Sequence, residues 1–484
     1  MRAALSTFSA IAVMFFAVTS RAETCVRPTD AAGYGGFKYD TAPTQTFDTP
    51  HVRVFYTVTG PHAVRPATTR ADNVPDDVAL VGQTTEDALV RYAQMGYRAP
   101  LSDADATCGS NGGDGRLDVY LVHFPAADGS TMAERCAKQG NVFTCSAFIL
   151  AEANLAAHYA SAEIGARTVL PHEAFHAVQD AYDAEMDRYF AEGTAQWAAK
   201  ALDPTLKDLE KNLPAFFKGS GRAIDSPIGD VTGSYLYGAA IWPLFLGQHY
   251  DANLIRESFE REATSGPPSL GAVGSALEGR GTSLKDAWST FWSWNAATGK
   301  RADVSGYPDA ASYPLLAVTE LTDTVTTLTS GSMSHVYHVA PSVRSVAAFA
   351  STDDVHSGVV LPIENGHVVL ARAMPLPATI ETEALVIVTS VSKTLADSPY
   401  TLNVTEAKAP VPDPPAFAPA DTTPNEDEGC AIGVPRGFAG GAERLVLFSA
   451  FTLALVLRRA SRHKRSLAHL FRSSVNRSSR KDLS

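Results

Sequence analysis

The chain has 484 residues, 45% of them hydrophobic, so its bulk can bury a core, and at about 150 residues per domain its length predicts roughly three domains. The formal net charge of −12 is unevenly distributed along the chain. Residues 458–484 carry nine Lys and Arg against one Asp, a net charge of +8, so the rest of the chain has a net charge of −20. Such an acidic body disfavours nucleic acid as a partner, and five cysteines are too few for a disulfide scaffold.

Residues 1–22 have the pattern of a secretory signal peptide. Arg2 precedes an apolar run at residues 11–18, and Ser20-Arg21-Ala22 follows as a small-x-small cleavage site. A buried N-terminal helix is the alternative. With cleavage after Ala22, the sequence predicts an exported protein that is extracellular or anchored at the cell surface.

Export would allow disulfide bonds to form. Cys136 and Cys145 have eight residues between them and flank an expected polar loop, so they are the easiest pair to join. Cys25 and Cys108 would then be left to pair with each other, although four cysteines allow three connectivities.

Residues 45–125 combine strand and helix patterns. Residues 51–58 and 117–122 alternate with period two, as β-strands do, and residues 76–96 form the pattern of an amphipathic helix. The glycine-rich stretch 111–115 could hold calcium, but its spacing is not that of an EF-hand loop. A turn before the next strand is favoured there.

The pattern then changes from helix to strand. Residues 150–300 are helical in pattern and rich in Ala, Leu and Trp, whereas residues 311–405 hold short β-rich runs separated by turn residues. We expect a separate all-β module there, a sandwich in the simplest case. The predicted fold class is therefore α+β.

A His-Glu-x-x-His motif begins at His172. Thr168 is expected to cap the N-terminus of the helix that carries it, which would leave Pro171 in the first turn. His172 and His176 are four residues apart, so both imidazoles lie on one face of a helix and can bind one metal ion. Glu173 lies beside them, where it can take a proton from water. Chance alone would produce this match in about one such chain in fifty.

The residues at fixed distances after the motif show which class of zinc protease could supply the third ligand. A metzincin requires Gly and His where Gln179 and Tyr182 stand, and an aspzincin requires Asp where Gln196 stands. Glu192 lies sixteen residues after His176 among apolar neighbours, where a carboxylate usually has a partner, although a solvated helix charge is the alternative. If the helix continues for two turns past His176 and the chain then reverses, Glu192 faces the histidine pair. Two His and one Glu with one open position are typical of catalytic zinc.

The run His-Glu-x-x-His-x-x-Gln, followed by Glu-Gly-Thr-Ala-x-Trp, resembles gluzincin-type secreted bacterial metalloproteases, in particular the HExxH metalloproteases of myxobacteria. The resemblance covers roughly residues 45–300. It implies a zincin-like catalytic domain with a small sheet, a helical active-site region and one catalytic Zn²⁺. It further implies His172, His176 and Glu192 as zinc ligands, Glu173 as general base, and a protein or peptide substrate.

Peptide hydrolysis would need a further hydrogen-bond donor for the developing oxyanion. Tyr235 and Tyr237, just before an apolar helix, are candidates, although tyrosines in such positions more often pack in a core. Gln196, one turn after Glu192, could orient a ligand histidine.

Two functions fit this pattern. The first is a secreted, surface-associated zinc endopeptidase. The second is a surface binding or adhesion protein in which the zinc site is degenerate or structural and the β module binds the partner. Glu173 favours the first, because a structural site needs no base beside its ligands.

The C-terminal segment has the composition of a sorting tail. Residues 408–429 form an acidic linker with six prolines, and Gly429-Cys430 precedes the mostly apolar Leu445–Leu457 and an arginine cluster. Thirteen residues are short for a bilayer span, and the basic flank would lie in the cytoplasm. The arrangement resembles the MYXO-CTERM sorting tails of myxobacterial surface proteins. The resemblance implies processing at Cys430 and membrane attachment through the tail.

The expected organisation has five parts. They are a signal peptide (1–22), a zinc metalloprotease-like catalytic domain (23–305), a β-sandwich-like module (306–407), a Pro-rich acidic linker (408–429) and a C-terminal sorting or membrane tail (430–484).

Overall fold

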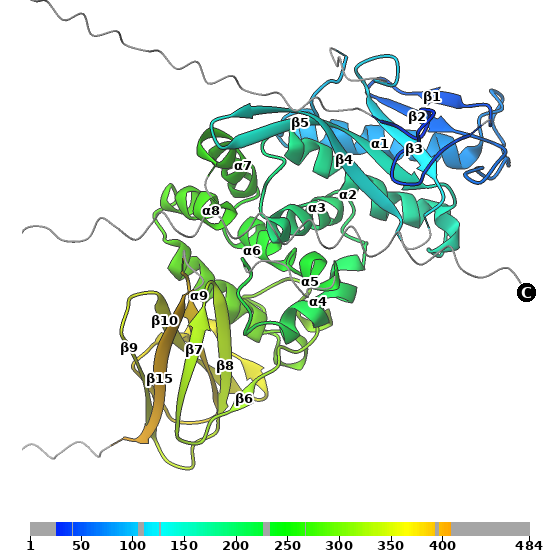
Figure 1. Cartoon of the computed structure of the whole chain (residues 1–484). Helices are drawn as coiled ribbons and strands as arrows, with labels where there is room; N and C mark the ends of the chain where they lie inside the picture. Colours follow the sequence, from blue (N-terminus) through cyan, green and yellow to red (C-terminus); the bar gives the residue numbers. More distant parts are fainter. Residues whose placement is uncertain are drawn as a thin grey trace, which may run out of the picture. The chain divides into compact units, whose positions relative to one another are not determined.

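The computed structural model describes residues 26–40, 42–104, 111–124, 127–225, 233–266, 268–392 and 396–407 (Figure 1). By its contacts the chain divides into residues up to Pro410 and residues from Val411 onward. The predicted signal peptide, linker and tail with Cys430 lie outside the described residues, as do Cys25 and Cys108. In the described part, no helix is long and apolar enough to cross a membrane.

The N-terminal sheet is mixed and forms one wall of the candidate site. Its strands are β1 (Gln45–Asp48), β2 (Val52–Tyr56), β3 (Leu117–Val122), β4 (Gly129–Gln139) and β5 (Val142–Glu152). They lie in the order β1-β2-β3-β5-β4, with β2, β3 and β5 parallel and both edge strands antiparallel to their neighbours. Strand β3 is buried along its whole length, as expected for a central strand covered on both faces.

Strands β4 and β5 form a long hairpin. The turn includes Gly140, whose φ of +64° favours glycine. Cys136 and Cys145, the pair that the sequence favours, face each other across the hairpin and form a disulfide. The polar stretch between them is therefore mostly strand and not loop. The β4 residues of this stretch lie at the sheet edge and are largely exposed. Because neither face of β4 is buried there, its sequence does not alternate between apolar and polar residues.

A helical region follows the hairpin. In the described residues, α1 (Asp76–Gln94) precedes the hairpin. The helices after it are α2 (Ala162–Asp180), α3 (Arg188–Leu202), α4 (Asp208–Lys218), α5 (Gly233–Gly238), α6 (Ile241–His249), α7 (Asn253–Ser265), α8 (Ser269–Glu278) and α9 (Leu284–Ala296). Helix α1 contacts β2 and α2, and α2 in turn contacts β4, β5 and α3 (Figure 1). Helix α2 is therefore held between the sheet and the other helices.

The expected cap of α2 at Thr168 is wrong. The cap lies seven residues earlier, where the Ser161 side chain accepts the Ile164 N–H at 3.3 Å. Thr168 lies inside the helix, and its hydroxyl donates to the Ile164 carbonyl at 2.8 Å. Pro171 is also internal to α2, although proline usually marks a helix start.

The C-terminal part of the described chain is all-β. Its strands are β6 (Thr319–Glu320), β7 (Thr324–Ser330), β8 (Met333–Val339), β9 (Ser345–Ser351), β10 (His356–Glu364), β11 (His367–Val368), β12 (Met374–Pro375), β13 (Ala378–Ile380), β14 (Ala384–Ser390) and β15 (Asp397–Glu406). One sheet has the order β11-β10-β14-β8-β6, with β12 beside β10, and the other has the order β13-β9-β15-β7. The two sheets share a core that includes Val360, Val386 and Leu402. Together with the helical region, this part gives the α+β fold class that the sequence predicts.

Helix α9 joins the β-strands to the helical region. Trp288 of α9 is fully buried, and the helix contacts β10 and β14. The core of the helical region continues into the six-stranded sheet through Val359, Leu361, Leu385 and Ile387. The boundary expected near residue 305 therefore lies beside a continuous hydrophobic core.

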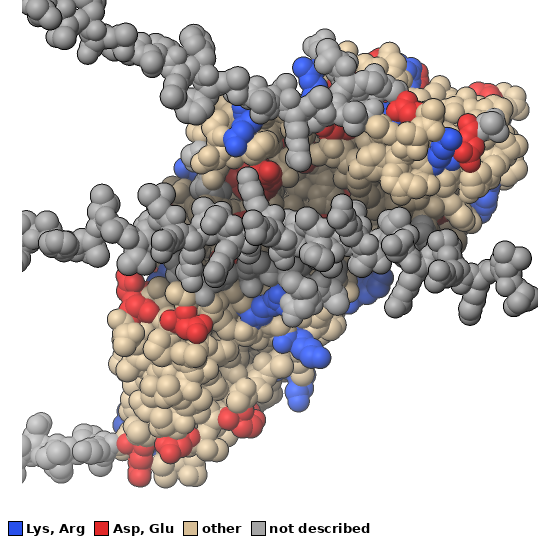
Figure 2. Space-filling view, viewed as in Figure 1, with Lys and Arg blue, Asp and Glu red and all other residues tan. Residues whose placement is uncertain are grey.

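Charged side chains of both signs occur on the described surface. On the face shown in Figure 2 they are interspersed among neutral residues and do not gather into one extended basic area. Several are paired, as Arg53 is with Asp48 and Arg280 is with Asp251 and Glu257.

Candidate metal centre

His172, His176 and Glu192, here called the metal triad, converge between α2 and α3. Helix α2 ends at Asp180, one turn after His176, and α3 packs against it after a short reversal of the chain. The two histidine Nε2 atoms are 3.0 Å apart, and Glu192 Oε2 lies 3.3 Å from that of His172 and 3.5 Å from that of His176. Among the described residues, this is the one group of three or more His, Cys, Asp or Glu side chains that could hold a metal ion.

The spacing of these donor atoms fits a tetrahedral ion. Zinc with nitrogen and oxygen ligands at about 2.0–2.1 Å places neighbouring ligand atoms about 3.3 Å apart. The three separations in the metal triad, from 3.0 to 3.5 Å, bracket that value. The nitrogen and oxygen donors are also ligand types that zinc accepts.

Gln179 fixes the orientation and the tautomer of His176. Its amide nitrogen donates to the Ala191 carbonyl and to the Thr194 hydroxyl, each at 2.8 Å, and that hydroxyl donates onward to the Phe190 carbonyl. The amide oxygen therefore faces His176 Nδ1, at 2.7 Å, and accepts its N–H. With the proton on Nδ1, the Nε2 lone pair of His176 is available to a metal ion.

The electrostatics of the metal triad favour positive charge at its centre. Burial would raise the pKa of Glu192, but hydrogen bonds to both histidines hold it well below its usual range. Burial would lower the pKa of His176, but its hydrogen bond with Glu192 and the nearby Glu173 raise that pKa to about 9. A divalent cation can supply this charge in place of protons.

Glu173 is held against strand β4. The Thr131 hydroxyl donates to Glu173 Oε2 at 2.7 Å and also lies 2.8 Å from the Glu173 carbonyl oxygen. A Cβ atom at Gly129 would come within 2.8 Å of the Glu173 and Val169 side chains. The close approach of β4 to α2 at this point therefore requires glycine.

The structure brings Tyr237, and not Tyr235, to the metal triad. The rings of Tyr237 and His172 are 5.6 Å apart, edge to face. Burial and the nearby carboxylates of Glu192 and Glu173 raise the pKa of Tyr237 to about 12, so its hydroxyl keeps its proton. Tyr235 is buried and packs against Phe216 at 5.2 Å.

In the described structure no hydrogen bond joins Gln196 to a ligand histidine, so its orienting role stays a prediction. Gln196 is buried in α3 and lines a cavity beside His172 and Glu173. The Nδ1 atom of His176 is instead bonded by Gln179, three residues further along the same helix. In the sequence, Gln179 departs from the metzincin pattern and ends the His-Glu-x-x-His-x-x-Gln run, and neither feature assigned it a partner.

The metal triad opens into a cleft between β4 and the helices. A cavity of about 440 Å³ is lined by the triad, Glu173, Tyr237 and residues 129–131. An adjoining cavity of about 310 Å³ shares His172, Glu173 and Tyr237 with it. Asp180 also lines the larger of the two, and burial raises its pKa to about 6 although His176 lowers it.

A larger apolar cavity, of about 610 Å³, lies between α1 and the start of β3. Leu89, Val90 and Leu101 are among its lining residues. None of the site residues predicted from the sequence lines it, so we place the candidate chemistry in the smaller polar cleft.

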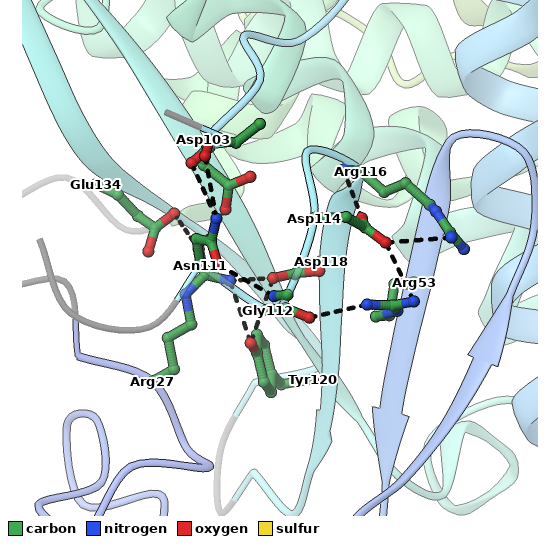
Figure 3. A network of polar contacts seen from close by, with 12 residues as sticks. Arg27, Arg53, Asp103, Asn111, Gly112, Asp114, Arg116, Asp118, Tyr120 and Glu134 are labelled. Atoms are coloured by element: carbon green, nitrogen blue, oxygen red, sulfur yellow. Dashed lines mark hydrogen bonds and ion pairs between the residues drawn. The ribbon is translucent and has the colours of Figure 1, made fainter. Parts of the chain in front are cut away.

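The glycine-rich stretch 111–115 forms a turn (Figure 3). Asn111 Oδ1 accepts the Gly113 N–H at 3.2 Å, and Asp114 Oδ1 accepts the Arg116 N–H at 3.0 Å. Gly112 has a φ of +69° and lies too close to Asp118 for any side chain at this position.

Beside this turn, Arg27 is the cation of a buried ion cluster (Figure 3). Its guanidinium lies 2.7 Å from Asp103 and 2.6 Å from Glu134, and it also pairs with Asp118. Burial raises the pKa of Asp118 to about 8 and that of Glu134 to about 7, although Arg27 lowers both. The arginine thus supplies the positive charge that these buried carboxylates share.

No family model matches the chain, and no curated protein matches it in sequence. The geometry of the cleft and the spacing of its residues are therefore the basis on which a function can be proposed.

Proposed function

We propose that the protein is an exported, surface-associated, zinc-dependent endopeptidase. The observation that carries the proposal is the convergence of the metal triad in an open cleft that also holds Glu173. Structural zinc sites are closed by four protein ligands, whereas catalytic sites keep one position for water or substrate. A three-ligand group that lines a cavity beside a carboxylate supports catalysis over the surface-binding alternative.

The mechanism assigns a separate task to each residue of the cleft. The metal triad would hold zinc, which supplies a Lewis acid that polarises the scissile carbonyl and acidifies water. Glu173 accepts the proton of the attacking water and returns it to the leaving amine. Thr131 keeps the Glu173 carboxylate in place through its hydrogen bond. The Tyr237 hydroxyl donates a hydrogen bond to the oxyanion as negative charge develops.

Strand β4 supports a protein or peptide as the substrate. It is the terminal strand of its sheet, where it pairs with β5. Gly129, Ser130 and Thr131 of β4 line the cavity of the metal triad. An extended peptide that paired with the outer side of β4 would lie across the triad with its scissile carbonyl near the ligands.

The sequence supports the proposed location and domain type. Residues 1–22 have the pattern of a signal peptide, and a disulfide between Cys136 and Cys145 is compatible with an oxidising compartment. Membrane attachment would come from residues 430–484. A mixed sheet followed by α2 and α3 is compatible with a zincin-like catalytic domain.

The test combines zinc analysis with proteolysis. Recombinant protein spanning residues 23–407 should contain one zinc ion per chain and hydrolyse casein, and a chelator should abolish this activity until zinc is restored. Glu173→Gln should keep zinc and lose nearly all turnover, because the base and the ligands are different residues. If zinc is bound and no substrate is cleaved, the binding or adhesion alternative would be favoured. If Glu173→Gln loses zinc, Glu173 is a ligand and the assigned roles are wrong.

A further inference from the structure

The cavity of the metal triad contains two carboxylates that the proposed mechanism does not use. Asp180 and Asp183 line it together with the triad. Asp180 is the last residue of α2 and follows His176 by one turn, which places it about 6 Å further along the helix. With Glu192 assigned to the metal and Glu173 to water, these two carboxylates remain to contact a substrate.

Asp180 differs from the other carboxylates of the cavity in its contacts. Among the described residues it has no hydrogen-bond or ion-pair partner for its carboxylate. It also lies at the C-terminal end of α2, where the helix dipole adds negative potential. Arg188, the one Lys or Arg in the cavity lining, is exposed and forms no ion pair with Asp180 in the described structure.

Asp183 has a different environment from Asp180. It is buried, and its carboxylate accepts the backbone N–H groups of Phe143 at 3.2 Å and Glu185 at 3.1 Å. These bonds hold the Asp183 side chain in the loop after α2. Asp180 is therefore the carboxylate that is available to a ligand, and Asp183 reinforces the negative potential beside it.

The same end of the cavity also has apolar walls. Ala184 and Met186, in the loop between α2 and α3, line it next to the two carboxylates. A Lys or Arg side chain packs its aliphatic stem against apolar surface and keeps its charged end at a polar group. An apolar wall next to an unpaired carboxylate suits this type of side chain.

From this geometry we infer that Asp180 determines substrate specificity and selects peptides with a Lys or Arg side chain within two residues of the scissile bond. The inference rests on the proposed peptidase function, because it assigns Asp180 a role in choosing the peptide that is cleaved. The distance follows from the fold, because an extended peptide advances about 3.3 Å per residue and Asp180 lies about 6 Å along α2 from a metal ligand. A charge-assisted hydrogen bond in a partly buried site corresponds to a preference of roughly tenfold over a neutral side chain.

The first experiment measures binding without turnover. Zinc-loaded Glu173→Gln protein is titrated with peptide pairs that differ only in Lys or Gln at one position, and this position is moved along the peptide. We expect roughly tenfold tighter binding of the Lys peptide at one position. Asp180→Asn in the same background should abolish this preference, and Asp180→Lys should transfer it to a Glu peptide.

A matched control removes a nearby charge that lies outside the cavity. Glu185 is exposed in the same loop and does not line the cavity, so Glu185→Gln should keep the preference for Lys. Zinc content and circular dichroism establish that each variant is folded, and Asp180→Ser replaces the amide variant if that variant loses zinc.

Equal affinity for the Lys and Gln peptides at every position would overturn the inference, as would a preference that persists in Asp180→Asn. Hydrolysis by the zinc-loaded wild-type protein reports separately on the proposed function. A protein that binds Lys peptides through Asp180 and cleaves none of them would refute the peptidase proposal and still support a cation-selective cleft.

Discussion

Replacing Gln179 with leucine should weaken zinc binding while all three ligands remain in place. The Gln179 amide accepts the Nδ1–H of His176 at 2.7 Å, so leucine would free that ring to rotate and to change tautomer. Loss of such an outer partner typically raises the metal Kd 10–100-fold, or about 1.4–2.7 kcal/mol. Leucine also removes the two hydrogen bonds that the Gln179 amide nitrogen donates, to the Ala191 carbonyl and the Thr194 hydroxyl. At about 0.5–1.5 kcal/mol each, their loss should lower folding stability by about 1–3 kcal/mol.

Zinc affinity would be measured by competition with a chelating dye, and stability by denaturant unfolding of the zinc-free protein. Gln196→Leu is the matched control, because Gln196 is a glutamine with 4% exposure in the adjoining cavity and is not the partner of His176 Nδ1. We expect its zinc Kd to equal that of the wild type. If Gln179→Leu binds zinc as tightly as the wild type, the inferred tautomer is wrong. A larger loss in Gln196→Leu would assign the orienting role to Gln196.

Three further predictions concern the cleft and the helical region. Tyr237→Phe should lower kcat about 100-fold with little change in KM, whereas Tyr235→Phe should leave kcat unchanged; similar losses in both would contradict the placement of Tyr237 alone beside the triad. Thr131→Val should lower kcat about tenfold at full zinc occupancy because Glu173 loses its hydrogen bond, and Thr131→Ser should restore it; loss of zinc in the valine variant would contradict a role confined to the base. Burial raises the pKa of Glu262 from 4.5 to about 8, so the folded protein keeps a proton that the unfolded chain releases, and stability is full below pH 4.5 and falls as the pH rises to about 8. Glu262→Gln should remove roughly 5 kcal/mol of this pH dependence, measured by denaturant unfolding between pH 4 and 9, and an unchanged slope would count against a buried neutral Glu262.

The ligand geometry could be predicted from the sequence because it depends on local spacing. Two histidines four residues apart share a helix face wherever that helix begins, so the error at Thr168 did not affect their placement. Glu192 needed only a short reversal of the chain, and the sixteen residues after His176 leave room for one. Apolar neighbours then indicated that its carboxylate has a partner.

Other parts of the site depend on contacts between distant segments, and the sequence did not reveal them. Thr131 reaches Glu173 from a strand 42 residues away in the chain, and that strand has no clear apolar alternation. Pro171 suggested a helix start because its missing N–H is harmless in a first turn, yet the packed helix tolerates it in the interior. Gln179 lies in the motif itself, and its position three residues after His176 is the one local signal that could have identified it.

Helix α9 also sets the order in which the protein can be completed during synthesis. Glu192 supplies the last ligand of the metal triad, whereas β14, which covers α9, ends only at Ser390. At about 5–20 residues per second, the growing chain needs roughly 10–40 s to pass from the one to the other. Trp288 is synthesised about midway through that interval, and from then until β14 is complete the face of α9 around it lacks its final cover. In a peptidase made in this order, the metal ligands would be synthesised early and the core completed late. Because the cleft would be complete only with the core, little time would remain in which it could cleave proteins before it leaves the site of synthesis.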